Sequence, residues 1–480
     1  WPSVTIISMA AFAIVCLVAY GRSIFGEYGR LDDYVAVSQN TRGLLYALRD
    51  QWLQAGRVIP AVLGVWLFSF VNSVSDLVFP RIISVLMVST GGAATTLLAL
   101  RLIPRKWSWS AILLAASAGI VAVSTTASPN AATWAIQAIQ LVALPTALSA
   151  GIVATSERPI LGLHWTASSG ALIIVSVFSY QQFVMLALMP TLLWSATRWV
   201  RRQVPHWGRA VIVAIMSTTA LVLSYLLVSI IGGEAKGRAF GQPLRENLVW
   251  FVRIFLPRTI DIFVLNSMRT VAMSAVLLSI LLAIPLIAGI RYLALSLAVV
   301  ISWMACSLVA FPTELWASYR LLYPAQLALW AGASVAAAVS LVDCGSKHRL
   351  IPRVGTVIFV VVSLFSLAVA QHRAYAYFAK PNSIDWASIR CVVANAENAS
   401  SNSVLVVNDW GASQSTVISY DEYGVIGSAV DWVLPYMVQL AQYELADSFG
   451  NMKVVSDDDA KSLTGEVLRF PQDICGTLDD

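Results

Sequence analysis

The chain has 480 residues, of which 58% are hydrophobic and only 12% are charged, and its mean hydropathy is +0.73. Soluble proteins carry about 25% charged residues, so this composition excludes an ordinary soluble fold and indicates that lipid solvates much of the surface. Residues 373–480 hold 6 basic and 15 acidic residues, whereas the rest of the chain holds 25 basic and 11 acidic ones. This asymmetry predicts two domains, a transmembrane domain over 1–372 and a smaller one over 373–480.

Apolar runs long enough to cross a bilayer as helices follow one another along the first domain. No small-residue cleavage site precedes Gly21-Arg22, so the first run is interpreted as a transmembrane helix and not as a signal peptide. The fold class predicted is an α-helical polytopic membrane protein. Its 11 expected transmembrane helices lie near 2–20, 77–103, 108–126, 131–153, 160–178, 181–198, 210–231, 269–289, 292–311, 321–341 and 355–372.

Short basic loops give the orientation. If the spans alternate, one side of the membrane receives a set of short loops that contain only Glu157 and Asp343 as acids. Their basic residues are Arg101, Arg105, Lys106, Arg158, Arg198, Arg201, Arg202, Arg209, Arg291, Lys347, Arg349 and Arg353. Such loops mark the cytoplasm. The other side is about as rich in Lys and Arg, but in long loops that also carry acids. The predicted topology has a cytoplasmic N-terminus and an outer acidic tail.

Two outer segments, 21–76 and 232–268, are too long to be simple turns. Within them, 34–53 and 244–262 place apolar residues at helical spacing between charged ones, which predicts helices that lie in the membrane interface. The apolar stretch 61–71 is too short to span and is expected to re-enter or to lie flat.

The tail has mixed helix and strand patterns. Residues 384–399 have a helical pattern, and 403–407 and 466–470 are strand-like, which predicts a small C-terminal α/β extracytoplasmic domain. Cys391 and Cys475 both lie in this tail. If the tail is outside, an oxidising compartment would preserve a disulfide between them.

The adjacent carboxylates Asp32 and Asp33 follow the first span directly, in the stretch 26–34. A carboxylate at the edge of a bilayer is costly unless it is solvated or paired, and in a cavity open to water and lipid it can act as a general base. The alternative interpretation is that the pair caps a helix that starts at Tyr34.

Cations are unusually frequent on the predicted outer face. Phosphate is their natural ligand, because Arg binds its oxygens in a bidentate manner. The alternative is that each cation snorkels or pairs with a nearby acid. The residues concerned are Arg57, Lys236, Arg238, Arg245, Arg253, Arg258, Arg269 and Arg320.

Tyr180 and Gln181 lie at an outer hairpin, where phenol and amide groups suit sugar hydroxyls or an ordinary interfacial turn. Arg81 is a candidate buried partner for Asp76 or for an Asp of the first outer segment. The sequence contains no Walker-type glycine loop, G-x-S-x-G elbow, zinc-ligand spacing or nucleic-acid module. We therefore expect no cofactor and no nucleic-acid partner.

The layout resembles the GT-C glycosyltransferases, and within them the serotype-converting glucosyltransferases (the Gtr group). The residues that carry the resemblance are Gly29-Arg30-Leu31-Asp32-Asp33-Tyr34, Gly56-Arg57 with Pro60, Tyr180-Gln181 and Tyr319-Arg320. The topology match covers nearly the whole chain, whereas these motifs comprise 13 residues.

The resemblance implies an enzyme of the bacterial inner membrane with its tail in the periplasm. Its donor would be a polyprenyl-phosphate sugar such as the glucose derivative, and its acceptor a lipid-linked glycan such as an O-antigen or another envelope polysaccharide. Asp32 or Asp33 would be the catalytic base of an inverting transfer, with no required metal. The substrate-binding residues would be Arg57, Tyr180, Gln181, Lys236, Arg238, Arg258, Tyr319 and Arg320.

Two rival functions remain open at this point. A glycan polymerase or ligase would use an arginine-rich outer loop and would not need the Asp pair. A lipid-linked sugar transporter or flippase would place polar residues in the middle of its spans and would often show an internal repeat. The spans here are almost free of charge in their middles, and no repeat is visible.

Overall fold

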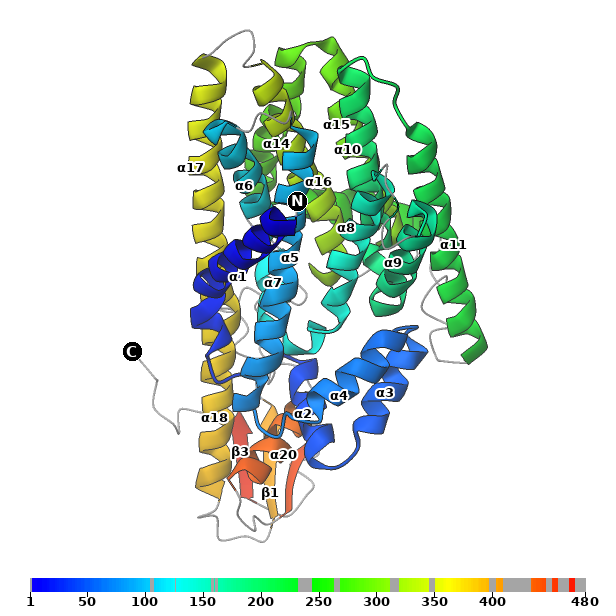
Figure 1. Ribbon diagram of the computed structural model, residues 1–480. Helices are drawn as coiled ribbons and strands as arrows, with labels where there is room; N and C mark the ends of the chain where they lie inside the picture. Colours follow the sequence, from blue (N-terminus) through cyan, green and yellow to red (C-terminus); the bar gives the residue numbers. More distant parts are fainter. Residues whose placement is uncertain are drawn as a thin grey trace.

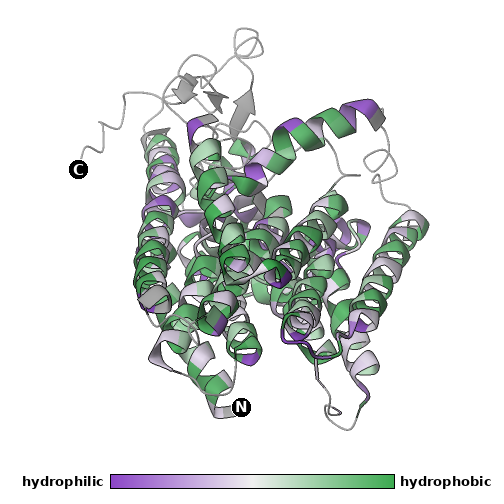
Figure 2. Ribbon diagram, turned by 90° about the horizontal axis from the view of Figure 1, so that it is seen from above, coloured by the Kyte–Doolittle hydropathy of each residue, from purple (hydrophilic) through white to green (hydrophobic). Residues whose placement is uncertain are grey.

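The fold is taken from a computed structural model. It describes residues 2–470. The ranges left out within them are 104–107, 126, 157–158, 160–162, 232–243, 263–267, 311–318, 345–349, 397–402, 409–432, 446–450 and 456–465. Most of the described chain is helical and forms one elongated bundle (Figure 1). The helices of the bundle are predominantly hydrophobic along their length (Figure 2).

In the described ranges, eight helical stretches are long and apolar enough to cross a membrane. This supports a polytopic helical membrane protein. The helices are α1 (Pro2–Ile24), α5 (Val78–Leu102), α10 (Leu188–Val200) with the preceding turn η5 (Gln181–Ala187), α11 (Trp207–Ile231), α14 (Met268–Ala288), α15 (Leu293–Ala310), α16 (Tyr319–Cys344) and α17 (Leu350–Arg373).

Three of the eleven expected spans are too short, as single helices, to cross a membrane. The run near 108–126 becomes α6 (Trp109–Val123), which is bent by 66° against α7 (Ala127–Thr133). The next two become α8 (Ala143–Ala154) and α9 (Trp165–Ser179), which are shorter. Between α7 and α8 the chain forms only the single turns η3 (Ala135–Gln137) and η4 (Gln140–Val142). Buried polar residues in this stretch break the regular helix, so the apolar run overstates the length of the span.

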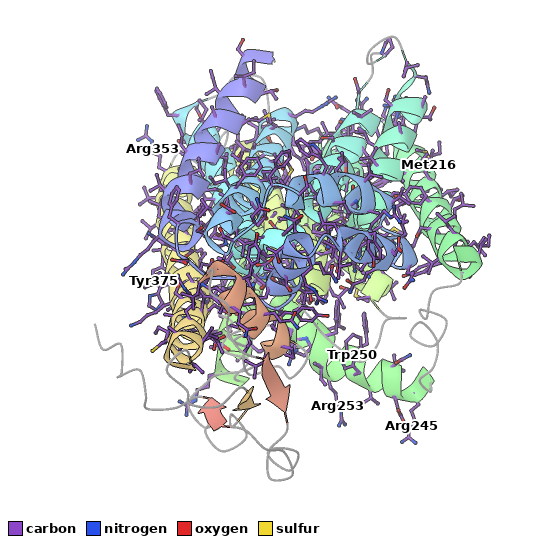
Figure 3. The ribbon with its side chains drawn as sticks, turned by 90° about the horizontal axis from the view of Figure 1, so that it is seen from below. Met216, Arg245, Trp250, Arg253, Arg353 and Tyr375 are labelled. Atoms are coloured by element: carbon purple, nitrogen blue, oxygen red, sulfur yellow. The ribbon has the colours of Figure 1, made fainter. Side chains whose placement is uncertain are left out.

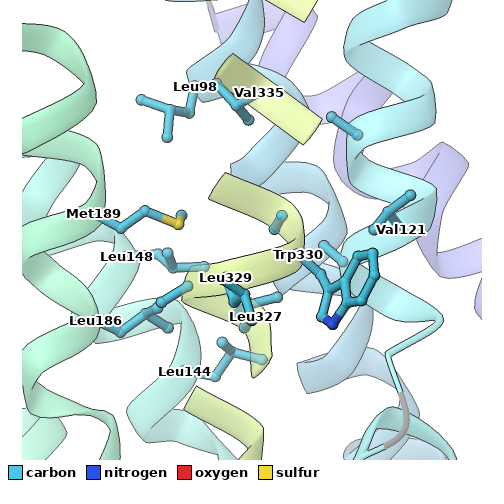
Figure 4. Close-up of a cluster of buried hydrophobic side chains, with 14 of the residues drawn as sticks. Leu98, Val121, Leu144, Leu148, Leu186, Met189, Leu327, Leu329, Trp330 and Val335 are labelled. Carbon is cyan, nitrogen blue, oxygen red and sulfur yellow. The ribbon is translucent and has the colours of Figure 1, made fainter. Parts of the chain in front are cut away.

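Helix α16 runs through the middle of the bundle. Its alanine-rich surface packs against α6, α14 and α15. Trp330 points toward Val121 of α6, while the leucines of α8 and η5 lie on the other side of α16 (Figure 4). Small residues permit this close helix packing, which is the usual arrangement for helices in lipid.

The first outer segment forms α2 (Asp32–Thr41), α3 (Leu45–Gln54), the π turn η1 (Pro60–Gly64) and α4 (Val65–Phe68). The single helix expected over 34–53 is therefore two helices. They separate at Gly43, whose φ of +68° is a left-handed conformation that ends α2. The stretch 61–71 is short and helical, and it exposes Val62, Trp66 and Phe70.

The second outer segment is continuous helix over most of 244–262, as the amphipathic pattern predicts. It consists of α12 (Leu244–Trp250), η7 (Phe251–Phe255) and α13 (Leu256–Ile260). Arg245 and Arg253 point away from the bundle (Figure 3). Leu248 and Val252 are exposed as well, while Trp250 is buried on the opposite side. A helix of this kind fits the interface between lipid and water.

The last span does not end at residue 372. It continues through the π turn η9 (Ala374–Ala379) into α18 (Lys380–Ala396), so that one long helix connects the bundle to the tail (Figure 1). The tail also contains α20 (Leu434–Glu444) and three short strands, β1 (Ser403–Asn408), β2 (Asn451–Val455) and β3 (Glu466–Phe470). The strands are parallel in the order β2-β1-β3, with Val404 opposite Met452 and Glu466.

A second hydrophobic core joins the first outer segment to the tail. It contains buried side chains of α2, α3, α18 and α20 and is separate from the core of the bundle. Tyr34 of α2 lies against Trp386 of α18 with ring centroids 5.5 Å apart. Glu444 accepts the backbone N–H of Val74 at 2.7 Å, and Arg390 pairs with Glu27 at 2.8 Å. The tail therefore holds the segment that carries the Asp pair.

This core predicts a strong effect of Trp386→Ala. Trp386 is only 1% exposed, and such a truncation costs about 3–5 kcal/mol. We expect a lower unfolding temperature in detergent and faster proteolysis of the chain between α2 and α4. Trp199→Ala is the matched control, because Trp199 is 51% exposed. Equal effects of the two substitutions would contradict the coupling of the tail to the first outer segment.

Candidate functional site

The side chain of Asp33 accepts hydrogen bonds from three backbone N–H groups, and this set of bonds is named the Asp33 clasp. Its carboxyl group has no exposed surface. Oδ1 accepts the N–H of Ile136 at 2.8 Å, and Oδ2 accepts the N–H groups of Arg30 at 3.1 Å and Ala135 at 3.4 Å. One side chain thus ties the start of α2 to η3, which lies between two of the interrupted spans.

Arg30 attaches the same segment to α7. Its guanidinium group is buried and donates to both the backbone carbonyl and the side-chain oxygen of Asn130. It also lies over the rings of Trp134 and Phe378, at 4.6 Å and 4.4 Å from the centroids. These contacts replace water around a buried cation.

Arg81 of α5 is the second buried cation near Asp33. Its guanidinium group donates to the carbonyl oxygens of Ile24, Gly26 and Tyr28 and lies over the Tyr28 ring at 3.8 Å from the centroid. Asp76 was expected from the sequence as a partner of Arg81. Its carboxyl group instead accepts the backbone N–H groups of residues 72 and 73. Arg81 therefore fixes the chain that leads from the first span to the Asp pair.

Burial raises the pKa of Asp33 to about 7, because desolvation disfavours the carboxylate. The positive charge of Arg81, the N–H of Ile136 and the charge of Arg30 act in the opposite direction. The two effects leave a carboxyl group that titrates near neutral pH at the start of α2.

Asp32 differs from its neighbour in exposure. It is only partly buried and lies in the first turn of α2, where the N–H dipoles favour acidic side chains. The helix begins at Asp32 and not at Tyr34, and its N-cap residue is Leu31, without a side-chain capping bond. The expectation that the Asp pair caps a helix at Tyr34 is therefore wrong. Leu31 has a φ of +31°, a strained value for a bulky residue directly beside the pair.

Three residues singled out by the sequence come together at the end of the first outer segment. The guanidinium group of Arg57 lies 4.8 Å from the centroid of the Tyr180 ring. Gln181 donates from Nε2 to the carbonyl of Ala55 at 2.9 Å. Between them, Gly56 adopts a φ of +72°. The structure thus brings the Gly56-Arg57 turn against the Tyr180-Gln181 hairpin, with Gln181 as a structural link.

A small cavity of about 10 Å³, which has room for about one water molecule, lies beside this cluster. Its wall is built from amides, aromatic rings and small apolar groups: Ala127, Asn130, Ala131, Gln137, Gln140, Leu141, Tyr180, Phe183 and Tyr323. The ring of Phe183 connects those of Tyr180 and Tyr323, at centroid distances of 5.9 Å and 5.6 Å. None of these lining residues is charged.

The hydrogen bonds of Asp33 lie next to the wall of this cavity. Ile136, which donates to Asp33, immediately precedes the lining residue Gln137, and Arg30 is bonded to the lining residue Asn130. The first outer segment therefore contacts two lining residues, Asn130 through Arg30 and Tyr180 through Arg57.

The second outer segment ends at the cavity too. The carbonyl of Arg258 accepts from Nε2 of Gln326 at 3.0 Å, and Oε1 of the same amide accepts the N–H of Ala127 at 3.0 Å. Arg258 itself is partly buried. Gln326 lies three residues beyond Tyr323 on α16, so α13 is fixed beside the cavity wall.

Several of the expected site residues, or their side chains, lie outside the part of the chain that the structure describes. Lys236, Arg238 and Cys475 lie outside the described residues, as do the side chains of Tyr319 and Arg320. Cys391 is disulfide-bonded, whereas Cys16, Cys306 and Cys344 are free. In the part of the chain that is described, no three His, Cys, Asp or Glu side chains come together in a way that would hold a metal ion.

Sequence reasoning missed the polar wall of the cavity, namely Asn130, Gln137 and Gln140. The signal was present, because these amides interrupt runs that were interpreted as spans. Polar residues at membrane depth usually face a cavity or a protein partner.

No protein-family model matches the chain, and the search of curated proteins finds no match.

The turn at Gly56 predicts a sharp steric effect. A Cβ atom there would lie 2.7 Å from both Nε2 of Gln181 and Cγ2 of Val228. Gly43 has a similar φ of +68° but open space around it. Gly43→Ala should therefore lose only about 1 kcal/mol, from backbone strain. Gly56→Ala should lose a further 1–3 kcal/mol or so from overpacking. Unfolding in detergent measures both, and equal losses would contradict the close approach of the two turns.

The raised pKa of Asp33 predicts a pH dependence of stability. The unfolded carboxyl group titrates near pH 3.9 or so. Between about pH 4 and 7 the folded state keeps a proton that the unfolded state has lost. The free energy of unfolding should therefore fall as the pH rises through this window, by on the order of 4 kcal/mol in total. Asp33→Asn should lack this slope, while Asp50→Asn, at an exposed acid, should keep it. Parallel curves for wild type and Asp33→Asn would contradict it.

Proposed function

We propose that this protein is a GT-C-type membrane glycosyltransferase. It moves a hexose, with glucose the first candidate, from a polyprenyl-phosphate donor to a lipid-linked or cell-envelope glycan such as an O-antigen. The observation that carries the proposal is the junction of three features at one end of the bundle. These are an acidic helix start at Asp32-Asp33, a neutral amide-lined cavity and Arg57 at the Tyr180 ring.

The proposed orientation places this end of the bundle in the periplasm of a bacterial inner membrane. At the opposite end (Figure 1), Arg201 pairs with Asp343 at 3.1 Å, which joins the junction after α10 to the end of α16. Arg101 and Arg209 donate to carbonyls at the C-terminal end of α8. This basic end is the proposed cytoplasmic face, in accordance with the positive-inside rule. The tail would then be an α/β domain in an oxidising compartment, where a Cys391–Cys475 disulfide would persist.

Asp32 is the proposed catalytic base, and Asp33 is the residue that positions it. Both oxygens of Asp33 already accept backbone N–H groups, and the side chain is fully buried. Asp32 is partly exposed in the same helical turn. It would take the proton from the acceptor hydroxyl as that oxygen attacks the anomeric carbon. The bond from that carbon to the phosphate oxygen breaks, and the sugar is transferred with inversion.

The leaving group is polyprenyl phosphate, which departs as an anion and needs no general acid. Arg57 and Arg258 are the described candidates to neutralise it, with Lys236, Arg238 and Arg320 as further ones. A positioned base supplies about 10²–10⁴-fold of the acceleration. Cations on the phosphate and the orientation of the two substrates supply the remainder.

The interfacial helix α12–η7–α13 is the proposed guide for the lipid chain. Its exposed apolar side chains, Leu248, Val249, Val252 and Ile254, favour contact with acyl or prenyl groups. Arg245 and Arg253 on the same helix would lie at the level of the phosphates (Figure 3). Since α13 ends beside the cavity, the helix connects the lipid surface to the site.

Asp32→Asn and Asp33→Asn test the division of roles. In lipid nanodiscs with radiolabelled polyprenyl-phosphate glucose and lipid-linked glycan, Asp32→Asn should slow transfer by about 10²–10⁴-fold with an unchanged unfolding temperature. Asp33→Asn should lose transfer and stability together, because its amide nitrogen would face N–H donors.

The controls for this experiment separate the rival functions. Donor binding by Asp32→Asn must stay near the wild-type value, which excludes a binding defect. Transfer that survives both substitutions would refute the Asp mechanism and favour an arginine-based polymerase or ligase. Movement of the donor across the membrane without transfer would identify a flippase.

A further inference from the structure

Helix α10 ends with an arginine at a position where glycine is usual. The backbone N–H of Arg202 donates to the carbonyl of Trp199 at 3.1 Å. The N–H of Gln203 donates to the carbonyl of Arg198 at 2.8 Å. These two bonds form a Schellman motif, in which the residue at the place of Arg202 is left-handed and usually glycine. Arg202 has a φ of +59°, which is unfavourable for a residue with a Cβ atom. Glycine would therefore serve the backbone better, and the side chain of Arg202 needs a role outside the helix ending.

The arginines next to Arg202 have partners within the protein. Arg201 pairs with Asp343 of α16 at 3.1 Å, and Nε of Arg198 donates to the carbonyl of Val204 at 2.9 Å. These bonds hold the connection between α10 and α11 in one conformation. Arg202 lies within this fixed connection, and its side chain is exposed. Its guanidinium group is thus presented to the surroundings from a rigid backbone.

A second exposed arginine lies at the same junction. Arg291 belongs to the single turn η8 (Ile290–Tyr292), which connects α14 to α15 and packs against α10. The hydroxyl group of Tyr292 donates to Asp343 at 3.3 Å. Asp343 therefore binds the residue before Arg202 and the residue after Arg291. The two connections meet at one end of the bundle (Figure 1).

Both connections must lie at the membrane surface, because each joins two helices that are long enough and apolar enough to span. Large apolar side chains are exposed around the two cations. Tryptophan is favoured at this depth, where one part of the ring is in lipid and the other near water. We name this surface the Arg202 patch, and it consists of Trp199, Arg202, Val204, Trp207, Ile290 and Arg291.

The Arg202 patch has an excess of positive charge. Residues 198–209 contain four arginines and no acidic residue, and Asp343, which packs against them, pairs with Arg201. Exposed guanidinium groups at the membrane surface lie at the depth of lipid phosphates, which arginine binds in a bidentate manner. A net negative head group matches this charge, whereas a zwitterionic one brings its own cation.

We propose that the Arg202 patch binds an anionic phospholipid of the leaflet at this end of the bundle. Arg202 and Arg291 contact its head group, and Trp199 and Trp207 lie beside its glycerol and upper acyl chains. The lipid bridges the α10–α11 and α14–α15 connections. The proposal is independent of sugar transfer, because the patch lies at the opposite end of the bundle from Asp32.

The test measures lipid preference by native mass spectrometry. Phosphatidylglycerol and phosphatidylcholine are added separately to the purified full chain in detergent. Each exposed cation should favour phosphatidylglycerol about fivefold. Arg202→Gly and Arg291→Gln should therefore each lower the preference about fivefold, while Arg202→Lys should retain it. Arg49→Gln is the matched control, because Arg49 is exposed but pairs with Asp50 at 3.0 Å. An unchanged preference in both Arg202→Gly and Arg291→Gln would overturn the proposal.

Thermal unfolding in phosphatidylcholine nanodiscs separates lipid binding from a structural role. Arg202→Gly relieves the left-handed strain, so its unfolding temperature should rise by about 1–2 °C. A weaker lipid preference in a more stable protein cannot result from a folding defect. A lower unfolding temperature with an unchanged preference would show that Arg202 serves the fold, and would refute the lipid site.

Two further measurements identify the occupant. Inorganic phosphate should stabilise the wild type much less than phosphatidylglycerol does, since it makes no contact with the exposed tryptophans. Equal stabilisation by the two would show a site for the anion alone. Self-association of the wild type that is lost in Arg202→Gly, with an unchanged lipid preference, would instead make the patch an interface between copies of this chain.

Discussion

Burial of the Asp33 carboxyl group is the constraint on which the rest of the site depends. Without exposed surface, this group needs protein dipoles in place of water. They come from the N–H groups of Arg30, Ala135 and Ile136, two segments that are about 100 residues apart in the sequence. The charges of Arg30 and Arg81 add to them. Because these segments meet at the carboxyl group, the start of α2 and the cavity wall have a fixed mutual position.

The two hydrophobic cores of the protein are built from different segments. In the bundle, small residues allow close approach: a side chain at Gly119 of α6 would collide with Phe12 of α1 and Thr96 of α5. Such packing stabilises helices in lipid, where burial of apolar surface contributes little. The second core includes large side chains such as Tyr34 and Trp386. The site lies at the boundary between the two.

How much the sequence predicts depends on the range of the interactions. The long apolar runs and the amphipathic pattern of 244–262 are local signals, and the structure has helices there. Arg57, Tyr180 and Gln181 were selected separately, and the structure brings them together. The bend between α6 and α7 was missed, since average hydropathy does not register the single amides near it. The core shared by the first outer segment and the tail was not predictable either, because Tyr34 and Trp386 are far apart in the sequence.

The fixed position of Asp33 gives a physical reason for two adjacent carboxylates. A general base must hold its oxygen within a few tenths of an ångström of the productive position, yet remain open to the acceptor. One side chain cannot be clamped by backbone N–H groups and also be accessible. In the proposed mechanism Asp33 takes the first task, and the partly exposed Asp32, one peptide bond away in the same helical turn, takes the second.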